Sequence, residues 1–180
     1  LVEAIYWHPG MKYHIDRIYL LKPVQFASIR RNEVKATLLS SAALSAAKGG
    51  EVPMLCTAEN IQQRAALVLQ DVHYVIECHF TMTEKAAPGD NPGKFQDILR
   101  RRLAKGQCYH QPCFGCREFP ANFREWHGSA EDIPALPLTQ DLGFMLYDLD
   151  YSDPENIRSQ FFRAKLENGV LDCRDVEVFT

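Results

Sequence analysis

The sequence predicts an α+β fold in which antiparallel strands outnumber helices. Residues 13–21 and 72–82 alternate apolar with polar side chains, as strands that bury one face do. Residues 94–105 place apolar side chains at helical spacing and end at Gly106, which is typical of a helix closed by glycine. With 46% hydrophobic and 24% charged residues, the 180-residue chain has the composition of a globular domain.

The N-terminal third begins with a short helical segment. The residues LVEAIYW read as the last turns of a helix, and YHIDRIYLL at 13–21 reads as a strand that Pro23 ends. Residues 24–34 continue as a second extended segment. Residues 36–52 are rich in Ala, Ser and Leu, and they are either a mobile loop or a short helix; we favour a mobile insertion.

The rest of the chain holds the clearest strand and the main helix. The strand is 72–82 (VHYVIECHFTM), whose second face carries His73, Glu77 and His79. Turn residues at 88–93 predict a loop, and the helix over 94–105 follows. Residues 142–149 predict a strand, and 161–171 predict a hairpin that turns at Asn168-Gly169.

The order of these elements matches the last part of a βαββαβ ferredoxin-like unit, provided that a first strand precedes Leu1. That strand lies centrally in such a unit, and without it two sheet edges would be unpaired. We therefore expect either a longer native chain or another segment in this position. Residues 1–123 are expected to form the ferredoxin-like domain, and 124–180 a small antiparallel β region.

Charge and composition exclude several classes of protein. A net charge of -3 argues against nonspecific coating of nucleic acid, but basic residues cluster at 30–31, at 100–102 with Lys105, and at Arg117 and Arg124. This distribution permits one basic face for phosphates. No apolar run approaches the roughly 20 residues that a membrane helix requires. Six cysteines without a signal-peptide pattern indicate a reducing cytoplasm.

Three of the cysteines lie close together around a histidine. Cys108, Cys113 and Cys116 with His110 could bind zinc tetrahedrally, because thiolates and imidazoles are its ligands. The four residues are crowded, however, whereas structural zinc sites usually join two separated pairs. We favour buried or half-exposed thiols, with no metal and no cofactor; a redox role is the remaining alternative.

Several long segments resemble one known family. They are LVEAIYWHPGMKYHIDRIYLLKPVQF, IRRNEV, QQRAALVLQDVHYVIECHF, NPGKFQDILRRRLAKGQCYHQPCFGCREFPANF and DLGFMLYDLD. Together they resemble the CRISPR-associated Cas5 proteins of subtype I-C (Dvulg), which belong to the RAMP superfamily. The signature from Lys105 to Phe123 is the most specific of them.

The resemblance implies a ferredoxin-like (RRM-like) RAMP domain followed by a small antiparallel sheet. It implies an endoribonuclease that cuts CRISPR repeat RNA without a metal, leaves a 2′,3′-cyclic phosphate and stays on the crRNA 5′ handle in a type I-C Cascade complex. The implied partners are repeat RNA or crRNA and other Cascade subunits, with double-stranded DNA as a further candidate and no membrane. The alternative is a non-catalytic subunit that binds the handle and supports assembly; a zinc or RRM-like regulator outside CRISPR is a third.

The resemblance also places candidate catalytic residues. The family's tyrosine falls on Tyr6 in EAIYW and its lysine on Lys94 in NPGKF, whereas Phe95 occupies the position of its histidine. Lys94 would offset phosphate charge at a helix start, and Tyr6 suits proton donation or positioning of the 2′-hydroxyl. Since Phe95 cannot transfer a proton, we expect slow cleavage unless another imidazole substitutes, and His110 is the leading candidate. The alternatives without a catalytic role are a core aromatic for Tyr6, a solvated lysine for Lys94 and an ordinary loop histidine for His110.

A further set of basic side chains is expected to contact RNA phosphates. Solvated faces are the alternative for each of them, and successive helical residues cannot all point the same way. The candidates are Arg30, Arg31, Arg101, Arg102, Lys105 and Arg117.

Overall fold

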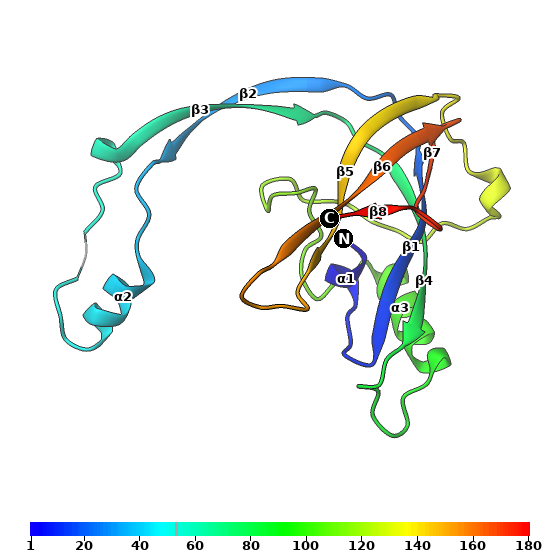
Figure 1. The fold of residues 1–180 in the computed structure, drawn as a ribbon, viewed down its shortest axis with the longest axis horizontal. Helices are drawn as coiled ribbons and strands as arrows, with labels where there is room; N and C mark the ends of the chain where they lie inside the picture. The colour runs from blue at the N-terminus through cyan, green and yellow to red at the C-terminus, as the bar shows by residue number, and fades with distance from the viewer. Residues whose placement is uncertain (53) are drawn as a thin grey trace. The chain divides into compact units, whose positions relative to one another are not determined.

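The structure is a computed structural model that describes residues 1–52 and 54–180. Its contacts divide the chain into two compact units, Leu1–Pro23 with His73–Thr180, and Val24–Val72 (Figure 1). The first unit contains α1 (Val2–Ile5), β1 (Met11–Leu20), β4 (Tyr74–Met82), α3 (Pro92–Lys105), β5 (Gln140–Asp150), β6 (Arg158–Glu167), β7 (Val170–Asp172) and β8 (Val178–Phe179). The second contains β2 (Phe26–Val34), α2 (Ser40–Ala47) and β3 (Ile61–Leu69). Short 3-10 turns lie at Ala58–Asn60 and Ala130–Asp132.

One antiparallel sheet organises the first unit. Its strand order is β4-β1-β7-β6-β5, with β8 also paired to β6. β1 pairs with β4 along its length, and β7 pairs with the other edge of β1 from Arg17 to Tyr19. The α+β class and the antiparallel C-terminal strands are confirmed. A strand before Leu1 and the division at residues 123 and 124 stay predictions.

Helix α3 packs on one face of β1 and β4. Asn91 caps its start, where the side-chain oxygen accepts from the backbone N–H of Lys94 at 2.9 Å. Gly106 ends it in the left-handed conformation, with φ of 62°. Phe95 is 0% exposed and packs with Tyr6 and Met11, so burial of its ring contributes about 1.5–3 kcal/mol to folding. The predicted helix is confirmed and begins at Pro92.

A second core lies between β6, β7 and the end of β1. Phe162, Ala164 and Leu166 are buried at alternate positions of β6, as one face of a pleated strand requires. The β6–β7 hairpin turns through Asn168 and Gly169, with φ of 49° and 77°. Positive φ at both central residues is the requirement of a type I′ turn, so the predicted hairpin is confirmed.

The second unit is a two-stranded ribbon. β2 and β3 pair antiparallel from Phe26 opposite Leu69 to Val34 opposite Ile61 (Figure 1). The extended segment predicted at 24–34 is confirmed, while β3 had no assignment from the sequence. Along the chain, α2 lies between β2 and β3. For residues 36–52 the short helix is therefore the correct alternative, and the segment is not a loop throughout. Many apolar side chains of this unit are exposed, and Met54 reaches 96%.

In the part of the chain that the structure describes, no helix is both long and apolar enough to cross a membrane.

Candidate active site

The end of α1 and the start of α3 bring Tyr6 and Lys94 together. Tyr6 directly follows α1 and is only 7% exposed, and its ring centroid lies 6.2 Å from that of Phe95. Burial raises the pKa of the Tyr6 phenol, whereas the charges of Arg102 and Lys94 act in the opposite direction. The ring of Tyr6 therefore belongs to the core, and the charge of the Lys94 ammonium acts on its hydroxyl.

Asp90 fixes the position of Lys94. The Lys94 ammonium donates to Asp90 at 2.7 Å, and the second oxygen of Asp90 accepts from the backbone N–H of Ala87 at 2.8 Å. The Asp90 side chain is 3% exposed, whereas that of Lys94 is 50% exposed. The hydrogen bond raises the pKa of Lys94 and lowers that of Asp90. Lys94 is thus a fixed positive charge that solvent can reach.

The family-signature loop holds α1 in place. The backbone N–H groups of Tyr109 and His110 donate to the carbonyl of Ala4 at 3.0 and 2.9 Å. The guanidinium of Arg102 donates to the carbonyl of Ile5 at 2.7 Å and lies over the Tyr6 ring, 5.1 Å from its centroid. These contacts satisfy the carbonyls that a helix end leaves open. The end of α3 and the loop after it therefore position Tyr6.

His8 is a member of this site that sequence reasoning missed. Its ring lies 4.8 Å from that of Phe95, and its Nδ1 accepts from the backbone N–H of Gly10 at 3.0 Å. The same nitrogen is 4.0 Å from an oxygen of Asp90. No periodic pattern marks His8; its place two residues after Tyr6 is the only signal. Asp90 was also missed, although its spacing of four from Lys94 is that of a helical ion pair.

His110, the predicted substitute imidazole, has an exposed side chain in the loop. Its ring contacts Tyr109, with centroids 4.3 Å apart, and its backbone is bound to α1. The structure therefore places His110 beside the segment that carries Tyr6, and its catalytic role stays a prediction.

The predicted RNA-binding residues lie in both units. Arg101, Arg102 and Lys105 lie on the last turns of α3, where Arg101 donates to the carbonyl of Asp97 at 3.2 Å within the same helix. Arg117 is exposed in the signature loop. Arg30 and Arg31 lie on β2 in the other unit, where Arg31 is 3.7 Å from Glu33. Arg102 is committed to Ile5 and Tyr6, and the RNA contacts of all six arginines and lysines stay predictions.

The cysteines are all free thiols in the structure. Cys108 and Cys113 are half-buried and Cys116 is exposed. Among residues 1–52 and 54–180, no group of three or more His, Cys, Asp or Glu side chains is arranged to hold a metal ion.

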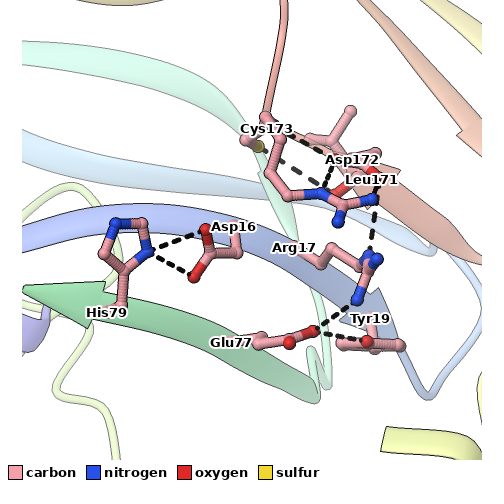
Figure 2. Close-up of polar contacts among 9 residues, drawn as sticks. Asp16, Arg17, Tyr19, Glu77, His79, Leu171, Asp172 and Cys173 are labelled. Carbon is pink, nitrogen blue, oxygen red and sulfur yellow. Dashed lines mark hydrogen bonds and ion pairs between the residues drawn. The ribbon is translucent and has the colours of Figure 1, made fainter.

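A second polar cluster, the sheet-face network, joins β1, β4 and β7 (Figure 2). Arg17 bonds Glu77 at 3.1 Å and Asp172 at 3.4 Å, and the Tyr19 hydroxyl donates to Glu77 at 2.7 Å. Arg174, and then Arg17, hold the pKa of Asp172 well below its usual range. These contacts tie three strands together through opposite charges.

An imidazole pair extends this network along β1 and β4. His79 bonds the Asp16 carboxylate at 2.9 Å, and its ring stacks on that of His14 with centroids 5.0 Å apart. Asp16 lies at an irregularity in the β1–β4 register, which turns its side chain toward His79.

Comparison with known proteins identifies the family. A sequence model of the CRISPR-associated protein (Cas_Cas5) family matches residues 1–174. The CRISPR pre-crRNA endoribonuclease Cas5d of Mannheimia succiniciproducens is 44% identical over 182 residues, which covers 96% of this chain and 78% of that protein. The protein of the same name from Thermus thermophilus is 36% identical over 155 residues, covering 86% of this chain but only 60% of its relative.

Solved structures agree on the fold. A functionally uncharacterized protein from Streptococcus mutans superposes with a TM-score of 0.69 at 22% identity, covering 99% of this chain and 80% of the other. A CRISPR-associated protein gives 0.67 at 20% identity with the same coverage. These matches support the predicted ferredoxin-like fold. This chain belongs to the CRISPR-associated Cas5 family.

Proposed function

We propose that this chain is a metal-independent endoribonuclease of subtype I-C that cleaves precursor crRNA within the repeat. The observation that carries the proposal is the packing of Tyr6 on Phe95, the residue next to Lys94, whose ammonium Asp90 fixes at 2.7 Å. The names of the two Cas5d relatives support the reaction, because both are called pre-crRNA endoribonucleases.

The reaction is a transfer within the RNA strand. The 2′-hydroxyl loses its proton and attacks the adjacent phosphorus, the bond to the 5′-oxygen breaks, and a 2′,3′-cyclic phosphate remains. Lys94 offsets the charge that the phosphate gains, and its fixed position avoids reorganisation during the step. Tyr6 protonates the departing 5′-oxygen, and His110 is the candidate base for the 2′-hydroxyl. Every role falls on a protein side chain, so the proposal requires no metal.

Binding of the RNA is assigned to basic side chains around α3. Lys105 and Arg101 lie at the end of that helix and Arg117 in the loop that follows, so all three belong to the unit that carries the site. Arg30 and Arg31 would contact phosphates from β2. Such contacts carry most of the affinity for nucleic acid and weaken with added salt.

The test is a denaturing gel of repeat RNA incubated with the protein and EDTA. The proposal predicts a defined cut and a 5′ fragment that ends in a 2′,3′-cyclic phosphate. RNA that is bound but remains intact would defeat the enzyme and leave the alternative, a subunit that binds the crRNA 5′ handle without cutting it.

A role in assembly is the second candidate function, and the β2–β3 ribbon favours it. An isolated two-stranded ribbon is marginally stable. The unit formed by this ribbon and α2 exposes large apolar side chains, Leu67 on β3 and Leu39 and Leu44 at α2. We propose that other subunits of a type I-C Cascade complex in the cytoplasm cover them, with double-stranded DNA as a further ligand of that complex. Replacing Leu39 and Leu44 with serine should abolish co-purification with those subunits and leave RNA cleavage unchanged. Unchanged co-purification would exclude this surface.

A further inference from the structure

We infer that His8 donates a hydrogen bond from Nε2 to a non-bridging oxygen of the scissile phosphate, beside Lys94. This inference rests on the proposed cleavage activity and adds a catalytic residue to it.

The His8 ring lies beside the position where the family's histidine is expected. The imidazole of His8 lies against the ring of Phe95, with centroids 4.8 Å apart and the planes tilted by 40°. Phe95 is itself fully buried and cannot move toward a substrate. His8 therefore lies on the residue that replaces the expected histidine, and its side chain remains 33% exposed.

The hydrogen bond to Gly10 determines which ring nitrogen of His8 carries the proton. The backbone N–H of Gly10 can only donate, so Nδ1 of His8 is the acceptor of their 3.0 Å hydrogen bond. Neutral His8 consequently carries its proton on Nε2. The ring then presents an N–H donor on the side away from Gly10, and it has no free lone pair with which to act as a base.

Asp90 is the neighbour that His8 and Lys94 share. Asp90 lies 4.0 Å from Nδ1 of His8 and accepts from Lys94 at 2.7 Å, so one carboxylate lies beside both side chains. Tyr6 precedes His8 by two residues and is influenced by the charges of Lys94 and Asp90. The imidazole and the ammonium thus lie beside the same carboxylate, so a phosphate bound by Lys94 would lie near His8.

The chemistry follows from these positions. A phosphodiester gains charge on its non-bridging oxygens as the 2′-oxygen attacks, and a fixed donor strengthens as that charge develops. Removing one such donor typically lowers the rate by about 10²- to 10³-fold. The bonds of the reaction are unchanged, because His8 neither takes nor gives up its proton.

The experiment compares His8→Gln, His8→Phe and His8→Ala with the parent protein in single-turnover cleavage of repeat RNA. The Gln amide can supply an N–H near the position of Nε2, whereas Phe keeps the ring contact with Phe95 and has no donor. We expect His8→Gln to remain within about 10-fold of the parent, and His8→Phe and His8→Ala to lose about 10²-fold or more. Melting temperatures and RNA affinity are measured for each variant.

The outcomes separate the inference from the function on which it rests. If the parent protein does not cut the RNA, the proposed function fails. If the parent cuts and all three variants cut equally well, His8 serves only the turn at Gly10 and the inference is overturned. Equal large losses in Gln and Phe variants that fold normally would also overturn it, since they would indicate proton transfer instead of donation. Retention in Gln with loss in Phe supports it.

Discussion

The two polar clusters of the first unit use similar residues in different ways. In the sheet-face network, Arg17 is held between Glu77 and Asp172, and opposite charges face each other across β1, β4 and β7. At the α1–α3 site, Lys94 forms an ion pair with Asp90, and half of its side chain is open to solvent. In the network, the charged side chains pair with one another and join the strands. The site keeps a cation accessible to a ligand.

Loss of the Tyr6 hydroxyl is expected to have the largest effect. Tyr6→Phe keeps the ring that packs on Phe95 but removes the group that protonates the 5′-oxygen, so single-turnover cleavage should fall about 10²- to 10⁴-fold. Tyr13→Phe is the matched control, because the buried Tyr13 hydroxyl has no partner in the part of the chain that the structure describes. That control should cleave normally and match or exceed the parent in stability. Equal rates in both variants would remove Tyr6 from the reaction.

Truncation of Phe95 tests whether the site depends on its core. Phe95→Ala should reduce the free energy of unfolding by about 3–5 kcal/mol, since it empties the space between α3 and the sheet. Urea denaturation measures this loss. Phe144→Ala, at a strand position that is 64% exposed, should cost far less. Similar losses in the two variants would show that α3 does not pack as the structure has it.

Breaking the sheet-face network should affect stability modestly and cleavage not at all. Asp172→Ala removes a partner from Arg17 and Arg174, but all three side chains are partly exposed, so we expect a loss of about 1 kcal/mol or less. Urea denaturation and the cleavage gel are run on the same preparation. A large fall in cleavage with normal folding would mean that the network, too, serves the RNA.

The pH dependence of stability at Asp90 should be the smallest effect. The folded protein lowers the pKa of this carboxyl, so its contribution is present above the unfolded pKa of about 3.9 and is lost as the pH falls through the folded pKa. The parent should therefore melt above Asp90→Asn near neutral pH, and the two should converge in acid. A difference that grows on acidification would contradict the Asp90–Lys94 pair.

Local patterns in the sequence predicted most elements of the fold. The alternation in β1 and β4, the glycine that ends α3 and the Asn168-Gly169 turn each reflect a short-range requirement of backbone geometry. The pairing of β7 with β1 depends on contacts between residues about 150 positions apart, such as Arg17 with Asp172, and no local pattern encodes it. Strand β3 was likewise not predicted from its own residues, because it forms by pairing with β2.

The candidate site divides in the same way. The family resemblance selected Tyr6 and Lys94, and in the structure Tyr6 packs on Phe95, the residue next to Lys94. His8 and Asp90 escaped notice because their roles come from contacts with Phe95 and Lys94 rather than from spacing. His110 was chosen for its residue type alone.

Lys94→Ala, assayed in EDTA against repeat RNA, is the decisive variant for metal-independent cleavage at the α1–α3 site. We expect a fall of about 10²- to 10³-fold in single-turnover cleavage, because the variant loses the fixed charge beside the phosphate. Lys12→Ala, an exposed lysine on β1, should cleave at the parent rate. Parent-like cleavage by a folded Lys94→Ala protein would exclude Lys94 from the reaction.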